Sequence, residues 1–141
     1  MIHIIPNFLS NEEIDLMLSQ TKFEEFTPVS YSPGVMTKVP YKPNNKNLFN
    51  KLNQLQYGEL RSVEMLLYKL GSYSPLHIDE ASFDGGPKWI RTGILMCTET
   101  YTGGELLFPR INGKFKFPKG TFISFPAGKG SNIYKIGRAH V

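Results

Sequence analysis

From Val63 onward the chain breaks into short apolar stretches separated by turn residues, and this pattern limits the fold more than any other feature of the sequence. Strands are expected at Val63–Leu70, Ser74–Asp79, Arg91–Thr98, Gly104–Phe108, Lys114–Phe117 and Gly120–Phe125. Between them, Asn112-Gly113 is a strong hairpin signal and Pro118-Lys119-Gly120 predicts a second turn. Short strands joined this closely indicate antiparallel sheets.

The part of the chain before Val63 predicts two helices. Ser10 and Glu13 form a capping box, so a helix should run to about Gln20. Its expected buried face consists of Ile14, Leu16, Met17 and Leu18. A second helix should begin at Asn44 or Asn45 and end near Gln56.

The segment Phe23–Pro43 between these helices is rich in proline and aromatic residues, and it is expected to be irregular. Two helices followed by many short strands predict an α+β, mainly β fold. The expected architecture is a double-stranded β-helix, or jelly roll, with two N-terminal helices packed on it. The open end of such a roll can hold a metal and a small ligand.

Composition is that of one globular domain. The chain has 141 residues, 40% of them hydrophobic, with no repeat or linker, so residues 1–135 are expected to form a single domain. The net charge of +4 includes no run of five basic residues, which does not favour a nucleic-acid partner. A single cysteine, Cys97, excludes an intrachain disulfide and fits a reducing cytoplasm. No signal peptide is evident, and no stretch approaches the ~20 apolar residues that span a bilayer, so no membrane association is expected.

His77-Ile78-Asp79 is the candidate metal site. In an extended chain, residues two apart point to the same side, so His77 and Asp79 should project together. One imidazole and one carboxylate are two of the three ligands in the 2-His-1-carboxylate triad that holds ferrous iron. A short motif of this kind recurs by chance, and the alternative is a surface histidine beside a turn-forming aspartate.

The residues around this pair carry a resemblance. Tyr68-x-x-Gly71-x-Tyr73 precedes it, and Arg91-Thr92 and Gly103-Gly104-Glu105-Leu106-x-Phe108 follow it. At these positions the sequence resembles the prolyl 4-hydroxylase-like branch of the iron(II)/2-oxoglutarate-dependent dioxygenases. The resemblance covers roughly 6–126 in outline, and its specific part is 68–108.

The resemblance implies a cofactor set and a reaction. Fe(2+) would be bound by His77 and Asp79, with 2-oxoglutarate as the cosubstrate and ascorbate as a further candidate. Tyr68 would hydrogen-bond a 2-oxoglutarate carboxylate, and Thr92 and Met96 would line the cosubstrate pocket. The implied enzyme is an oxidoreductase that hydroxylates a C–H bond of a prolyl or other protein side chain, and a small-molecule substrate is also compatible. No catalytic residue beyond the metal ligands is implied.

The C-terminal end departs from this pattern. A third ligand, a histidine, and a cation for 2-oxoglutarate are expected beyond Pro126, but the sequence offers only His140 and Arg138. The codons ATC GGA AGA GCA CAC GTC, a common sequencing-adapter string, would encode residues 136–141. We therefore expect a non-native tail at 136–141 and a roll without its last strands. Continuous genomic sequence across this point would contradict that interpretation.

Three functions stay open at this stage. The complete protein is expected to be a dioxygenase. A genuine third ligand at His140 is the alternative to a non-native tail, and in either case the printed chain should bind iron poorly. The alternatives are a non-catalytic jelly-roll binding module and an inactive fragment of such an oxygenase.

Overall fold

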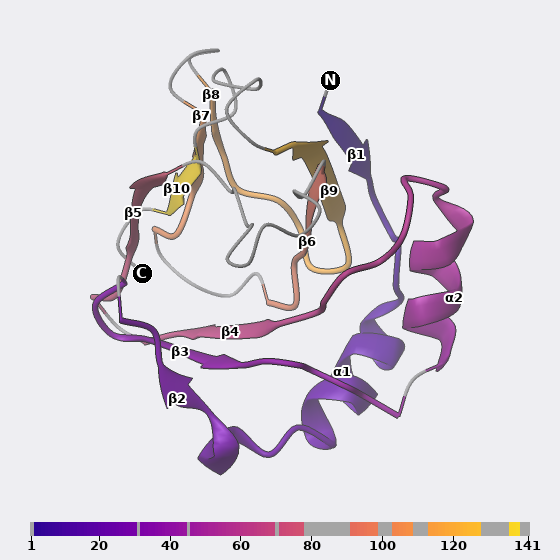
Figure 1. Cartoon of the computed structure of the whole chain (residues 1–141), viewed down its shortest axis with the longest axis horizontal. Coiled ribbons are helices and arrows are strands. Elements are labelled where there is room, and N and C mark those ends of the chain that lie inside the picture. The colour runs from indigo at the N-terminus through magenta and orange to yellow at the C-terminus, as the bar shows by residue number, and fades with distance from the viewer. Residues whose placement is uncertain are drawn as a thin grey trace.

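Two helices and ten short strands make up the part of the chain that the computed structural model describes (Figure 1). The described residues are 2–30, 32–44, 46–69, 71–77, 91–98, 103–108, 113–127 and 136–138, with the backbone alone at 76, 77 and 136–138. The strands form three antiparallel sheets, and the two helices pack beside them. The predicted α+β, mainly β class with two helices ahead of most strands is confirmed.

The first sheet has the strand order β1-β9-β6. Its strands are β1 (His3–Ile5), β9 (Phe122–Pro126) and β6 (Arg91–Leu95). In the β6–β9 pair, Thr92 lies opposite Phe125 and Ile94 lies opposite Ile123. Because side chains alternate along a strand, these residues share one face of the sheet, and Phe122 and Ser124 belong to the other.

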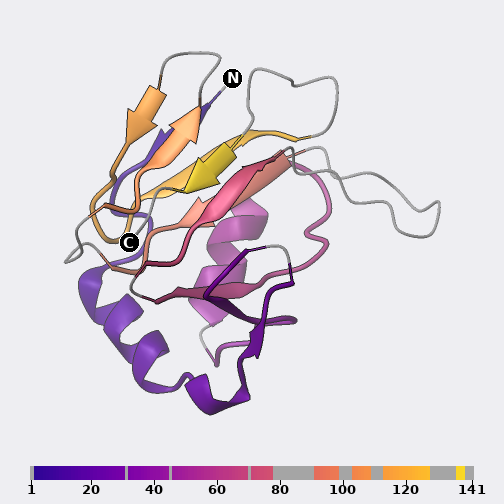
Figure 2. The same ribbon diagram turned by 90° about the vertical axis from the view of Figure 1, so that its left-hand side faces the viewer.

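The second sheet has the order β5-β10-β7-β8, so its second strand comes last in the sequence (Figure 2). Its strands are β5 (Ser74–His77), β10 (Ile136–Arg138), β7 (Leu106–Phe108) and β8 (Gly113–Phe115). Gly113 pairs with Phe108 within the β7–β8 ladder. Gly113 is therefore a strand residue, and Asn112 of the predicted hairpin turn lies outside the described residues.

The third sheet, β2-β3-β4, corrects the prediction of an irregular segment at 23–43. Besides a 3₁₀ turn at Phe23–Glu25, that segment contains β2 (Thr27–Pro28) and β3 (Val35–Lys38). β3 pairs along its whole length with β4 (Met65–Tyr68). The strands are short and one contains proline, so the segment has little strand pattern of its own and is ordered by its pairing with β4.

Both helices begin close to their predicted positions. α1 (Asn11–Ser19) starts from the Ser10 capping box, in which the Glu13 amide donates to Ser10 Oγ and the Ser10 amide donates to Glu13 Oε1, each at 3.1 Å. The Ser10 amide, which donates to the Glu13 carboxylate, contributes most to lowering the pKa of Glu13 below its usual value. α2 spans Lys46–Gln54.

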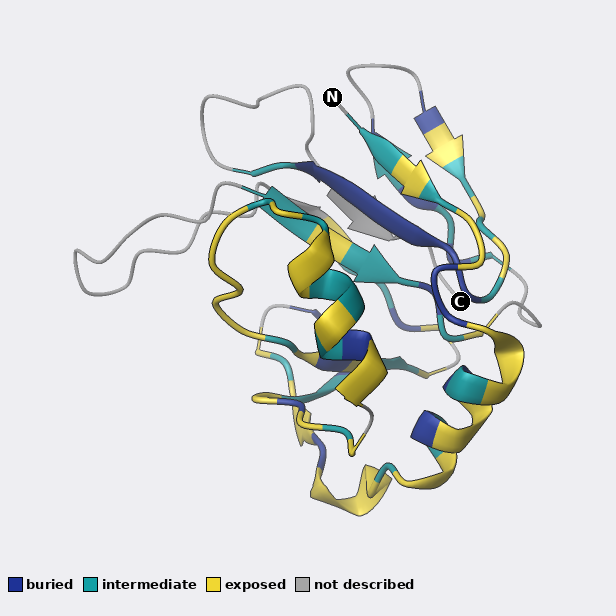
Figure 3. Ribbon diagram, turned by 90° about the vertical axis from the view of Figure 1, so that its right-hand side faces the viewer, coloured by how far each residue is buried: buried dark blue, intermediate teal, exposed yellow. Residues whose placement is uncertain are grey.

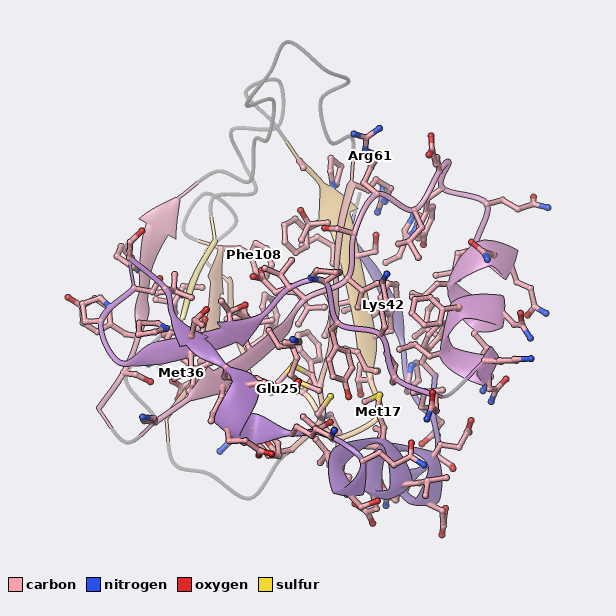
Figure 4. The ribbon with its side chains drawn as sticks, turned by 60° about the horizontal axis from the view of Figure 1, so that its bottom comes forward. Met17, Glu25, Met36, Lys42, Arg61 and Phe108 are labelled. Atoms are coloured by element: carbon pink, nitrogen blue, oxygen red, sulfur yellow. The ribbon has the colours of Figure 1, made fainter. Side chains whose placement is uncertain are left out.

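One residue of the predicted buried face of α1 is wrong. Ile14 and Met17 are buried, but Leu16 is 58% exposed. At 3.6 residues per turn, Leu16 lies two residues from Ile14, about 200° around the helix, and therefore faces away from the core. Figure 4 shows Met17 on the side of α1 that faces the sheets, and Figure 3 shows that the outward faces of both helices are largely exposed.

Two apolar clusters lie on opposite sides of β9. The helix-side cluster is formed by Phe8, Leu9, Ile14, Met17, Phe26, Tyr41, Leu48, Met65 and Phe122. The inter-sheet cluster, between the first and second sheets, is formed by Met96, Leu106, Phe108, Ile123 and Phe125. Each buried side chain of this size stabilises the fold by about 1.5–3 kcal/mol.

The turn Pro118–Thr121 confirms the predicted second turn and joins the N-terminal segment to β6. The Thr121 amide donates to the Pro118 carbonyl, and Gly120 adopts φ +92°, which glycine accepts without strain. The Gly120 carbonyl accepts a hydrogen bond from the Phe8 amide, and the Gly120 amide donates to the Met96 carbonyl.

Within the described ranges, neither helix has the length and apolar character needed to cross a bilayer.

The ring of Phe122 leaves no space for a side chain at position 93, so glycine should be required there. A Cβ at Gly93 would lie 2.4 Å from Phe122 Cζ, and that ring stacks on Phe8 with centroids 4.7 Å apart. We expect Gly93→Ala to lower the free energy of unfolding by about 1–3 kcal/mol, measured by urea denaturation, because the buried ring must shift. In a Phe122→Leu background the same change should cost less. Equal costs in the two backgrounds would contradict this account.

Candidate functional site

The turn between β4 and β5 explains the Tyr-x-x-Gly part of the motif. The Ser72 amide donates to the Lys69 carbonyl at 2.9 Å, and Gly71 has φ +81°, a conformation that glycine adopts readily. Ser72 Oγ also donates to the Lys69 carbonyl, at 2.6 Å. This tight reversal brings β5 back beside the end of β4, where Tyr68 lies.

A chain of hydroxyl groups links three segments at this reversal. Tyr68 Oη lies 2.7 Å from Ser74 Oγ, and Ser74 Oγ lies 3.2 Å from Ser32 Oγ. Ser32 is 1% exposed, and Tyr68 is half-buried. Tyr68 was predicted from the motif around it, whereas Ser32 and Ser74 were not predicted, because no local signal connects residues 42 positions apart.

His77 is the last residue of β5, and its backbone lies opposite Ile136 of β10. Asp79, the second predicted ligand, lies outside the described residues, so the joint projection of the pair stays a prediction. Arg138 of β10 lies opposite Ser74, while His140 is outside the described residues. Within the described ranges, no group of three or more His, Cys, Asp or Glu residues is placed to hold a metal ion.

Thr92 lies near the start of β6, and Met96 directly follows the last residue of that strand. By the β6–β9 register, Thr92 and Ile94 are on the face toward the second sheet. Ile94 packs against the inter-sheet cluster, and Met96 belongs to it, being 3% exposed. Their predicted role in binding a cosubstrate stays a prediction.

Arg91, for which the sequence left the role open, lies on the other face of β6. Its guanidinium carbon is 4.7 Å from the Tyr57 ring centroid, and its Nε donates to Ser124 Oγ at 2.9 Å. Tyr57 Oη lies 2.6 Å from His3 Nδ1, so the cluster joins β1, β6, β9 and the segment after α2. These contacts hold Arg91 on the side of β6 opposite Thr92 and Ile94.

Comparisons with solved structures define the fold class. Neither a protein-family model nor a curated protein sequence matches the chain. A viral collagen prolyl hydroxylase from Paramecium bursaria Chlorella virus-1, solved as a 2OG complex, matches with a TM-score of 0.80 at 19% identity, over 99% of this chain and 87% of that chain. A truncated form of the same viral enzyme matches with a TM-score of 0.73 at 20% identity, over 99% and 82%.

A bacterial structure gives the same result. The prolyl-4-hydroxylase of Pseudomonas putida matches with a TM-score of 0.67 at 15% identity, over 99% of this chain and 84% of that chain. The chain therefore has the fold of prolyl hydroxylases, which are iron- and 2-oxoglutarate-dependent dioxygenases. The resemblance inferred from Tyr68 to Phe108 is confirmed at the level of the fold.

Cys97 should be an unreactive thiol. Burial raises its pKa to about 11, although the nearby Lys119 acts in the opposite direction. Compared with a thiol of pKa 9.0, we expect about 100-fold slower reaction with a disulfide reagent near pH 8, because the thiolate is the nucleophile. Measured by absorbance, the rate should keep rising with pH toward 11. The same chain unfolded in guanidinium is the control, and equal rates in the two states would refute the assignment.

Proposed function

We propose that the protein is an iron(II)- and 2-oxoglutarate-dependent dioxygenase that hydroxylates a C–H bond. The observation that carries the proposal is the prolyl hydroxylase fold, which extends over almost the whole chain. The His77-x-Asp79 sequence supports it, because it begins at the end of β5 in the second sheet of that fold.

We further propose that the first and second sheets form a jelly roll. The path of the chain supports this arrangement, because consecutive strands from β5 to β10 cross between the two sheets rather than filling one sheet first. β5 lies in the second sheet, β6 in the first, β7 and β8 in the second, β9 in the first and β10 in the second. The inter-sheet cluster fills the space between them.

In this proposal His77 and Asp79 hold iron, and Tyr68, Thr92 and Met96 contact 2-oxoglutarate. An imidazole and a carboxylate are suitable donors for ferrous iron, so the residue types fit the metal. When bound, iron with 2-oxoglutarate supplies the activation of dioxygen for attack on a C–H bond. The chain supplies orientation: the Tyr68 hydroxyl donates to a carboxylate, and the apolar side chains of β6 exclude water from the site.

The third metal ligand is expected at the position opposite His77. Directly opposed residues of an antiparallel pair are nearest cross-strand neighbours, with Cβ atoms about 4.5–5.5 Å apart. That position is occupied by Ile136, which has no ligating atom and is the first residue of the tail interpreted as non-native. We propose that the natural sequence has a histidine at or beside this position.

The proposed substrate is a prolyl or other side chain of a protein. The support is that the matched structures are those of a collagen prolyl hydroxylase and a prolyl-4-hydroxylase. A non-catalytic binding module of the same fold is the competing function, and the isoleucine opposite His77 favours it for the printed chain.

The decisive experiment is iron-dependent formation of succinate from 2-oxoglutarate by the protein translated from the uninterrupted gene. Unmodified protein should produce succinate, and His77→Ala or Asp79→Ala should each abolish it, because two remaining ligands leave the iron poorly held. His3→Ala is the matched control, since His3 contacts Tyr57 on the face of the first sheet that points away from the second sheet. Turnover retained in both ligand variants would defeat the metal assignment.

Ile136→His in the printed chain should strengthen binding of Mn²⁺, used in place of iron to prevent oxidation. A third protein ligand should increase the affinity at least as much as the roughly 10–100-fold that an outer-sphere partner contributes. Calorimetric titration measures the change. Arg138→His is the control, because Arg138 lies opposite Ser74 rather than His77. Equal gains from the two variants would contradict the proposed position.

A further inference from the structure

We infer that Ser74 is a positioning residue whose hydroxyl orients the Tyr68 phenol toward the carboxylate of 2-oxoglutarate. The inference rests on the proposed function and adds to it a residue that the comparisons do not assign. It concerns the side chain of Ser74, which is three residues before His77 on the same strand.

The geometry brings three hydroxyl groups into line from three separate segments. Tyr68 ends β4, Ser74 begins β5, and Ser32 lies in the segment before β3. The Tyr68–Ser74 oxygen separation of 2.7 Å is the usual length of a strong O–H···O hydrogen bond, and the Ser74–Ser32 separation is 3.2 Å. Ser74 is thus the middle member of the chain.

The backbone around these hydroxyl groups is closely packed. Ser32 and Ser72 are both buried, and a Cβ placed on Gly34 would lie 2.8 Å from Ser72 Cβ. The Ser32 carbonyl accepts the Val35 amide, which fixes the segment that supplies Ser32. Ser74 therefore lies on a strand at a tight reversal, and the second hydroxyl that it contacts belongs to the buried residue Ser32.

The direction of the hydrogen bonds follows from the chemistry of the ligand. An ionised carboxylate only accepts hydrogen bonds, so Tyr68 must use its single proton to donate to it. Tyr68 then accepts at its contact with Ser74, Ser74 donates to Tyr68, and the Ser74 oxygen accepts from Ser32. A hydrogen bond to a charged acceptor is about twice as strong as a neutral one, and aligned hydroxyls polarise one another.

Without Ser74, the phenol of Tyr68 would lose the hydrogen bond that it accepts when it donates its own proton to the ligand. A purely structural role for the Tyr68–Ser74 contact predicts a different result, namely lower stability with unchanged ligand affinity. The two roles can therefore be separated by measuring ligand binding and stability in the same variants.

The test measures the dissociation constant of 2-oxoglutarate by calorimetry, with Mn²⁺ in place of iron, in the protein used for the succinate assay. Ser74→Ala should weaken binding roughly 3–10-fold, the effect of losing one hydrogen bond. Ser74→Thr retains the hydroxyl and should bind close to the unmodified protein. In a Tyr68→Phe background, Ser74→Ala should have no further effect, because the group that it orients is absent. In turnover assays, Ser74→Ala should raise KM for 2-oxoglutarate and leave kcat nearly unchanged.

The outcomes distinguish this inference from the proposed function. If the unmodified protein does not bind 2-oxoglutarate, the proposed function fails and the inference falls with it. Two results would overturn the inference alone. One is that Ser74→Ala binds 2-oxoglutarate as tightly as the unmodified protein does. The other is that Ser74→Ala weakens binding equally with and without Tyr68→Phe. Thermal unfolding of each variant confirms that affinities are compared between folded proteins.

Discussion

Successive residues of β9 serve different parts of the structure. Phe122 packs with the helices, and Ile123 packs between the two sheets. Ser124 accepts a hydrogen bond from Arg91, and Phe125 returns to the inter-sheet cluster. All four are buried, and β9 pairs with β1 on one side and β6 on the other. A shift of β9 by one residue would exchange its two faces and place Ser124 in the inter-sheet cluster. The partners of Thr92 and Ile94 on β6 therefore depend on the β6–β9 register.

The sequence was sufficient to predict those elements whose start or turn is determined by a few neighbouring residues. The capping box of Ser10 and Glu13 started α1 correctly, and Pro118-Lys119-Gly120 formed the expected turn, because these depend on neighbouring residues alone. Leu16 was assigned to the wrong face because being apolar does not determine the angle of a residue around a helix. β2 and β3 were missed because β3 is ordered by pairing with the distant β4, and β2 by pairing with β3, which local pattern does not encode.

The candidate site shows the same division. Tyr68, His77 and Thr92 were selected because a motif surrounds them, and the structure places all three on strands. Ser32 and Ser74 are ordinary residues in the sequence, and only the fold brings their hydroxyl groups to Tyr68. Arg91 could not be assigned from the sequence, because its face of β6 depends on the partners Tyr57 and Ser124.

The position of β10 has a consequence for the order in which the protein can assemble. β10 lies between β5 and β7, yet it follows both in the sequence. During synthesis, the edges of β5 and β7 wait until the residues at the position of β10, here 136–138, have left the ribosome. Pairings that join distant parts of a chain form slowly, and unpaired edges promote association with other chains. A nascent chain of this fold would therefore depend on rapid completion, or on protection by a chaperone, to avoid aggregation.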